Sequence, residues 1–150
     1  MRDPPSADAI TAWARLLRAQ TVLLDHVQVS LKAAGLPPLV WYDVLLELHR
    51  ARPEGLRQYE IGERMLLSKS NLSRLLDRLV ARSLIERRTC PEDARAQVVR
   101  ITGAGHELLR RMWPVYGRCI RELVEARLEP AERRRLAELL ALLVDGRAPR

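Results

Sequence analysis

Apolar residues recur at alternating spacings of three and four in the N-terminal part of the chain. The series runs from Ile10 to Leu31 and includes Gln20 as a polar member. This spacing is typical of a helix that packs on other helices. Gly35 then suits the position just after a helix, because glycine adopts left-handed backbone angles easily. The pattern therefore predicts a helix over about residues 6–34.

Short elements alternate in the middle of the chain. We expect a second helix at about 39–50, a very short strand at Leu56-Arg57 and a short helix at 58–65. Ser68 is a favourable N-cap for a further helix over 69–82, because its hydroxyl can accept a hydrogen bond from a free backbone amide. The expected buried face of that helix consists of Leu72, Leu75, Leu76, Leu79 and Val80. Two short helices in this order predict a helix-turn-helix.

Two segments that favour extended structure follow. Residues 84–90 and 96–101 are expected to be strands, and the second is rich in β-branched residues. Residues 91–95 between them form a polar turn, so the three pieces predict a hairpin.

The last third of the chain returns to a helical pattern. Thr102 is a suitable N-cap for a helix to about Arg127, and Pro130 suits the first position of a final helix that ends at Gly146. The final helix carries an apolar stripe of Leu136, Leu139, Leu140 and Leu143. Neither terminal segment can bury its apolar face on so small a central module. A helical dimer interface is therefore expected.

The order of elements predicts a mainly α fold with a small β-hairpin. With 150 residues, of which 47% are hydrophobic, the chain is long enough for a single domain with its own core. No apolar run approaches the roughly 18 residues of a membrane span. The N-terminus lacks the pattern of a signal peptide. We expect a cytoplasmic protein in which Cys90 and Cys119 remain thiols.

The positive charge is concentrated in the predicted helix-turn-helix and hairpin. The formal net charge is +7, and an acidic partner such as nucleic acid or a membrane surface is the usual explanation. Between Arg64 and Arg100 there are nine basic and four acidic residues, so five of the seven excess charges fall there. This segment covers most of the helix-turn-helix and the hairpin, which favours nucleic acid.

Two stretches resemble the MarR family of winged helix-turn-helix transcription factors. One is the run LLSKSNLSRLLDRL from Leu66 to Leu79. The other is Asp93-x-Arg95, followed by VVRIT at 98–102 and by Gly105. The resemblance covers about residues 8–146, and the two motifs together are specific for the family.

The resemblance implies a sequence-specific regulator, in most cases a repressor, that binds a pseudo-palindromic operator in double-stranded DNA as a homodimer. The DNA-binding region would cover about residues 39–101, and the dimerisation helices about 6–34 and 103–146. Ser83 stands where the family usually has glycine after the recognition helix. A left-handed serine there would cost about 1 kcal/mol.

A recognition helix enters the major groove with its N-terminus first. Asn71 and Arg74 are the expected base readers, because paired hydrogen bonds suit adenine and guanine edges respectively. Ser68, Lys69 and Ser70 are expected to hold phosphates, with help from free backbone amides at the helix start.

The hairpin is expected to act as the wing. The resemblance places Arg95 in the minor groove, where negative potential is concentrated. It also implies that Asp93 shapes the turn and that Asp77 orients the wing arginine. Arg87 and Arg88 are candidate phosphate contacts, although a solvated strand face is an equal alternative for each. The full set of expected DNA contacts is Ser68, Lys69, Ser70, Asn71, Arg74, Arg78, Arg87, Arg88 and Arg95.

The resemblance further implies a pocket for a small aromatic or anionic effector at the junction of the first, second and fifth helices. Apolar pockets with a few polar groups suit such ligands. Aromatic residues at helical spacing also form ordinary core, and that alternative stays open. The candidate residues are Trp13, Gln20, Trp41, Tyr42, Met112 and Tyr116.

No motif in the sequence indicates other chemistry. His26, His49 and His106 lack the spacing of a metal site, and no catalytic constellation or nucleotide fingerprint is present. We therefore expect no enzyme activity, no metal and no cofactor. The remaining alternative is a winged-helix dimer whose basic face binds a protein partner without sequence-specific DNA binding.

Overall fold

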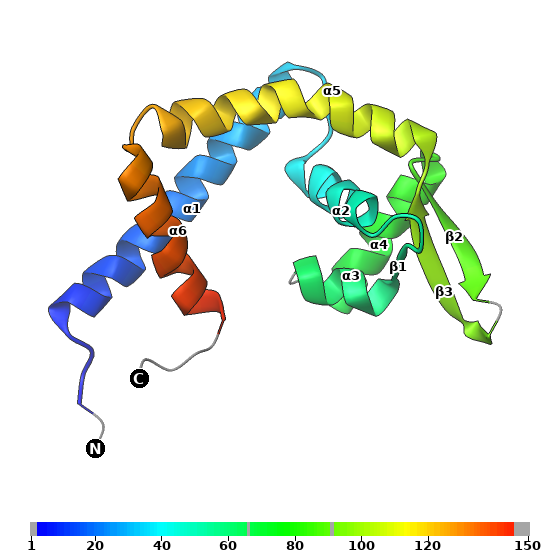
Figure 1. The fold of residues 1–150 in the computed structure, drawn as a ribbon, viewed down its shortest axis with the longest axis horizontal. Helices are drawn as coiled ribbons and strands as arrows, with labels where there is room; N and C mark the ends of the chain where they lie inside the picture. The colour runs from blue at the N-terminus through cyan, green and yellow to red at the C-terminus, as the bar shows by residue number, and fades with distance from the viewer. Residues whose placement is uncertain (1–2, 66, 91, 146–150) are drawn as a thin grey trace. The chain divides into compact units, whose positions relative to one another are not determined.

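The computed structural model describes residues 3–65, 67–90 and 92–145, with the side chains of Ala94 and Arg95 outside the description. The helices and strands follow the predicted order (Figure 1). The chain divides into a central unit of residues 28–115 and a terminal unit of residues 1–27 and 116–150.

Helix α1 (Ala7–Ala33) ends at the expected glycine. Gly35 has a φ of 68°, and the N–H of the next residue, Leu36, donates to the carbonyl oxygen of Leu31 at 2.9 Å. This hydrogen bond satisfies a carbonyl that the end of the helix would otherwise leave unpaired. The chain then enters α2 (Leu39–Arg50).

Helices α2, α3 (Gln58–Met65) and α4 (Lys69–Ala81) supply most of the core of the central unit. The residues with 0% exposure on these helices are Val44, Leu45, Leu48, Ile61, Leu76 and Leu79. The predicted burial of Val80 is wrong, because this side chain is 36% exposed. Helix α4 ends one residue later, and Val80 lies on the exposed side of its last turn, beside the buried Leu79.

Three strands form an antiparallel sheet in the order β1-β3-β2. Strand β1 (Leu56–Arg57) pairs with one edge of β3 (Asp93–Ile101), and β2 (Ile85–Cys90) pairs with the other edge. The β2–β3 hairpin projects beyond helices α3 and α4 (Figure 1). The fold class is therefore as predicted, mainly α with a small β wing.

The predicted hairpin turn was too long. Strand β3 begins at Asp93, not at Ala96, and Asp93 pairs with Cys90 across the hairpin. A register shift between Thr89 and Cys90 lets the pairing continue towards the tip. The polar residue Asp93 does not prevent pairing, because its side chain is exposed while the backbone stays extended.

Helix α5 (Gly103–Ile120) begins at the predicted cap. The hydroxyl of Thr102 accepts a hydrogen bond from the N–H of Gly105 at 3.1 Å and donates to the carbonyl oxygen of Ser83 at 2.6 Å. Ser83 has a φ of 56°, which confirms the left-handed residue expected after α4.

The predicted α-helix to Arg127 is wrong in its last turns. Residues Arg121–Glu125 form a π-helical segment, η1, in which the N–H of Ala126 reaches back five residues to the carbonyl oxygen of Arg121 at 2.8 Å. Apolar periodicity does not distinguish this wider turn from an α-helical one.

Helix α6 (Pro130–Val144) starts at the expected proline, while the predicted end at Gly146 lies outside the described residues. In the terminal unit, large apolar side chains of α1 and α6 are exposed. They include Ile10, Trp13, Leu17, Leu136, Leu139, Leu140 and Leu143. Among the described residues, no helix has the length and apolar character needed to cross a membrane.

Candidate nucleic-acid interface

The start of α4 carries the polar residues expected to meet DNA first. The Oγ atom of Ser68 accepts a hydrogen bond from the backbone N–H of Asn71 at 3.3 Å, so Ser68 caps the helix as predicted. The O–H group of this serine can still donate to a phosphate oxygen. Lys69 and Ser70 follow in the first turn, and both are exposed.

Helix α4 separates its apolar and polar faces. Leucine side chains from Leu72 to Leu79 are buried against the central unit. Asn71, Arg74 and Arg78 are exposed, and the two arginines lie four residues apart on one side of the helix. Neither arginine pairs with a carboxylate in the part of the chain that the structure describes. Both cations can therefore meet a phosphate or a base edge.

An ion pair joins the recognition helix to the wing. The Nη1 atom of Arg87, on β2, lies 2.8 Å from Oδ1 of Asp77, on α4. The side chain of Arg87 is 25% exposed and that of Asp77 is 61% exposed, so solvent still reaches the carboxylate of this pair. Asp77 was expected to orient the wing arginine, Arg95, whose side chain lies outside the described residues, so that role stays a prediction; among the described residues, Asp77 pairs with Arg87. Arg87 is therefore engaged within the protein.

The remaining wing residues differ in how they are held. The Nε atom of Arg88 lies 2.9 Å from a carboxylate oxygen of Glu86, and the Arg88 side chain is 62% exposed. Asp93 is exposed at the start of β3. Arg95 is part of strand β3, and the structure does not describe its side chain. Its expected minor-groove role stays a prediction.

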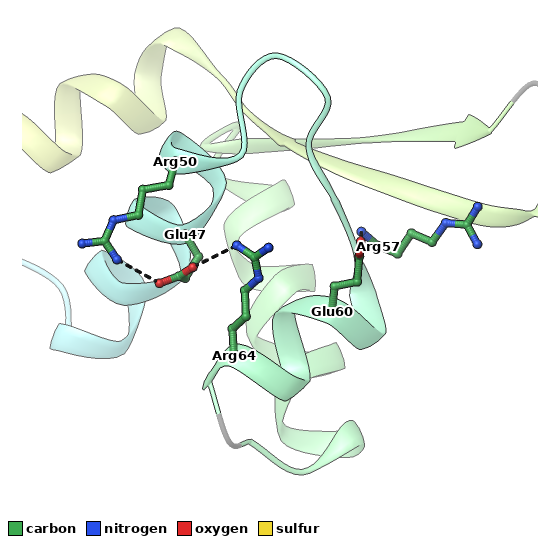
Figure 2. Close-up of polar contacts among 5 residues, drawn as sticks. All are labelled: Glu47, Arg50, Arg57, Glu60 and Arg64. Carbon is green, nitrogen blue, oxygen red and sulfur yellow. Dashed lines mark hydrogen bonds and ion pairs between the residues drawn. The ribbon is translucent and has the colours of Figure 1, made fainter. Parts of the chain in front are cut away.

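Glu47 fixes the first helix of the helix-turn-helix. Its two carboxylate oxygens contact Nη1 of Arg50 and Nη1 of Arg64, each at 3.2 Å (Figure 2). Arg50 lies on the same helix as Glu47, whereas Arg64 lies on α3, so the carboxylate links α2 to α3. The Glu47 side chain is 22% exposed. Arg50 and Arg64 are thus paired with Glu47 within the protein and are not candidates for DNA contacts.

Arg57 is placed differently. Its backbone N–H donates to Oε2 of Glu60 at 2.7 Å at the start of α3, while its guanidinium extends away from the Glu47 cluster (Figure 2). Arg57 lines a cleft of about 770 Å³ between α3, the start of α4 and β3. Tyr59, Lys69 and Gln97 also line this cleft.

Arg57 and Tyr59 were not among the predicted DNA contacts. Tyr59 is 61% exposed, which is unusual for an aromatic side chain beside a core. The available signal was their position at the start of the first helix of the motif, next to the turn that leads to α4. The position of these two residues in the sequence does not by itself predict a cleft, because the other wall of the cleft belongs to the distant strand β3.

The six residues expected at an effector pocket belong to both units. Trp13, Gln20 and Tyr116 lie in the terminal unit, where the first two are exposed. In the central unit, Met112 has 0% exposure and Tyr42 is buried with its ring stacked on Trp113 at 6.4 Å.

Trp41 lines a cavity within the central unit. That cavity has a volume of about 710 Å³, and Arg82 and Arg111 also line it. The guanidinium carbon of Arg82 lies 6.0 Å from the centroid of the Trp41 ring. The effector pocket as a whole stays a prediction.

Comparison with known proteins gives consistent relatives. A sequence profile of the MarR family matches residues 34–96. The chain is 28% identical over 137 residues to the transcriptional repressor MprA of Escherichia coli strain K12. That match covers 87% of this chain and 77% of MprA.

Solved structures share the fold over nearly the whole chain. Sco3205, a MarR family transcriptional regulator from Streptomyces coelicolor crystallised in complex with DNA, matches with a TM-score of 0.89 and 29% identity, covering 99% of this chain and 93% of that one. A mutant MarR from E. coli, complexed with operator DNA, matches with a TM-score of 0.78 and 22% identity over 94% and 99% of the two chains. BpsR from Bordetella bronchiseptica, a protein whose DNA binding is regulated by 6-hydroxynicotinic acid, has a TM-score of 0.78 and 22% identity over 89% and 98%.

Proposed function

Because the chain belongs to the MarR family of transcriptional regulators, we propose that it binds a pseudo-palindromic site in double-stranded DNA as a homodimer and represses transcription there. The observation that carries this proposal is an exposed polar face on α4 beside a wing that Asp77 and Arg87 tie to the same helix. The description of MprA as a repressor supports the sign of regulation.

The polar residues of α4 fall into two groups, one placed to contact bases and the other placed to contact phosphates. Asn71 and Arg74 lie beyond the capping residue on the exposed face, where their planar groups can form paired hydrogen bonds with base edges. Lys69 and Ser70 lie in the first turn, where free backbone amides also point outward. We assign base reading to the first two residues and phosphate binding to the second two.

The cleft beside α4 is a suitable seat for the DNA backbone. With α4 in the major groove and the wing in the neighbouring minor groove, the sugar-phosphate strand that separates the grooves must cross the surface between them. Arg57, Tyr59 and Lys69 line that surface and can donate hydrogen bonds to phosphate oxygens. Glu63 and Asp93 line it as well, so the phosphates would follow its cationic walls.

Dimerisation is supported by the apolar surface of the terminal unit. Trp13 is 64% exposed on α1, and Leu139 and Leu143 are 44% and 68% exposed on α6. Exposed apolar stripes of this kind are typical of an interface with another chain. A second copy of the chain is the occupant we propose, because a two-fold dimer presents two recognition helices to two half-sites.

Release of the DNA by a small aromatic or anionic ligand completes the proposal. The regulation of BpsR by 6-hydroxynicotinic acid supports this class of ligand. The cavity lined by Trp41, Arg82, Glu107 and Arg111 offers an indole wall and two cations, and its one carboxylate, Glu107, is paired with Arg110, so a planar anion suits it. Such a ligand releases DNA if it binds the conformation unable to hold DNA more tightly than the other.

Substitution at Arg74 and at Lys69 should separate the two kinds of DNA contact. We expect Arg74→Ala to relax the preference at one base position of the site, at a cost of about 1–3 kcal/mol. We expect Lys69→Ala to weaken all sequences alike and to lower the slope of log affinity against log salt by about 1. Fluorescence anisotropy on a panel of operator variants measures both effects.

Arg134→Ala, which removes an exposed cation from α6, serves as the matched control and should leave both readouts unchanged. If the Arg74 and Lys69 variants behave alike across the panel, the assigned roles are wrong. If neither variant changes DNA binding, the alternative of a protein-interaction module with a basic face gains support.

A further inference from the structure

Two histidines that are distant in sequence meet inside the central unit. His49 lies in the last turn of α2, and His106 lies in the first turn of α5. Their Nδ1 atoms are 3.2 Å apart, and their rings meet edge-on with centroids separated by 5.1 Å. Both side chains are partly buried. The proposed DNA contacts make no use of either ring.

Arg52 determines where the ring protons lie. Its Nη2 atom is 3.3 Å from Nε2 of His49, and its Nε donates to the carbonyl oxygen of His49 at 3.0 Å. A guanidinium can only donate hydrogen bonds, so Nε2 of His49 is an acceptor and the proton of this ring lies on Nδ1. That proton points to Nδ1 of His106, whose own proton then lies on Nε2. Both rings are neutral in this arrangement, in which Arg52 donates to His49 and His49 donates to His106.

We propose that His49 and His106 form an acid-sensitive joint, which is closed while both rings are neutral and opens when either ring takes up a proton. A second proton on His49 would lie on Nε2 and face the donor of Arg52. A second proton on His106 would lie on Nδ1 and face the N–H of His49. If His106 is protonated, moving the proton of His49 from Nδ1 to Nε2 restores the hydrogen bond to His106 but breaks the one from Arg52. Either protonation therefore removes a hydrogen bond and adds a cation beside Arg52.

The surroundings oppose the charged form of the joint. Burial is the largest cause that lowers the pKa of His106 from its ordinary value, followed by the nearby charges of Arg52, His49 and Arg110. In the described part of the chain, no third histidine, cysteine or carboxylate completes a metal site with this pair.

Carboxylates on the neighbouring elements are bound to other cations. These ion pairs are Glu47 with Arg50 and Arg64 on α2 and α3, Glu86 with Arg88 on β2, and Glu107 with Arg110 on α5. On β3, the Nε of Arg100 donates to the backbone oxygen of Glu54. None of these contacts supplies a negative charge to the histidines themselves.

The joint lies at the root of the wing. His49 comes just before the loop that leads into β1, and His106 comes just after the end of β3. Strands β1 and β3 are paired, with Leu56 opposite Val99. The joint therefore ties together the two chain segments that hold this edge of the sheet, and its opening should loosen the base of the wing.

Denaturant unfolding between pH 5.5 and 7.5 tests the joint without DNA, so its result is independent of the proposed function. A histidine whose pKa is lowered by folding binds fewer protons in the folded state than in the unfolded chain. Below the unfolded pKa of about 6.5, the unfolding equilibrium constant should therefore rise by up to about tenfold per pH unit as the pH falls. His106→Phe keeps a ring for the edge contact and should flatten this dependence.

The exposed histidine of the chain provides the control. Nε2 of His26 lies 3.7 Å from Oε2 of Glu122 in the terminal unit. The variant His26→Asn should still show the rise of the unfolding equilibrium constant at low pH. Nitrogen-15 NMR of the wild-type imidazoles supplies a readout that needs no variant to fold. We expect the proton of His49 on Nδ1 and the proton of His106 on Nε2 at pH 7.5. In the ring that takes up a second proton on acidification, the signals of the protonated and unprotonated nitrogens should merge. A His106 that titrates above 6.5, the opposite tautomers, or an unchanged pH profile in His106→Phe would overturn the proposal.

Discussion

Gly55→Ala is expected to destabilise the central unit strongly. Gly55 has a φ of 83°, which costs an alanine about 1–2 kcal/mol. A Cβ atom there would lie 2.5 Å from the carbonyl oxygen of Val99 and 2.9 Å from Cγ1 of Val98. Because β1 pairs with β3 at these residues, the strands would have to separate. Overpacking of this kind adds about 1–3 kcal/mol, which gives a total loss of about 2–5 kcal/mol.

Gly35→Ala is the matched control for this prediction. Gly35 also has a positive φ, of 68°, but a Cβ atom built there has no neighbour within 4 Å. This variant should therefore lose only the conformational part, about 1–2 kcal/mol. Urea unfolding followed by circular dichroism measures both free energies. Equal losses in the two variants would show that the close approach of Gly55 to β3 is not a constraint on the wing.

The double variant Leu139→Glu/Leu143→Glu is expected to convert the proposed dimer into monomers and to abolish specific DNA binding. These leucines lie one turn apart on the apolar stripe of α6. Burying each in a dimer contributes about 1.5–3 kcal/mol, and burying glutamates instead adds a desolvation cost. A loss of at least about 3 kcal/mol per protomer weakens dimerisation more than a hundredfold. A single recognition helix would then address a single half-site.

Sedimentation at micromolar concentration measures this change. Arg134→Glu alters the charge of the same helix on its opposite side and should remain dimeric. A wild-type chain that sediments as a monomer would remove the basis of the proposed assembly. A double variant that remains a dimer would place the interface on other residues.

The sequence predicted the elements that depend on local periodicity. The spacing from Ile10 to Leu31 placed α1, and the Ser68 hydroxyl marked the start of α4. Errors occurred where local pattern is ambiguous. The exposure of Val80 and the π-helical turn at 121–125 both fall at helix ends, where the apolar stripe no longer decides the structure.

The candidate site was predictable only in part, for a related reason. The polar face of α4 follows from the residues themselves, because its leucines fix which side is buried. The partners of charged side chains do not follow, since pairs such as Asp77 with Arg87 or Glu47 with Arg64 join separate elements. Long arginine side chains can reach several carboxylates, and only the packed structure selects among them.

We propose that this chain recognises a particular double-stranded DNA sequence through α4 and the wing. Selection of bound fragments from the genome that encodes it, followed by affinity titrations at several salt concentrations, tests that claim most directly. We expect enriched fragments to share two related half-sites about 10 base pairs apart, centre to centre. They should bind at least about 10³-fold more tightly than shuffled fragments of the same composition, and log affinity should fall linearly with log salt. Equal binding of selected and shuffled fragments, or no binding of DNA at low salt, would contradict the account.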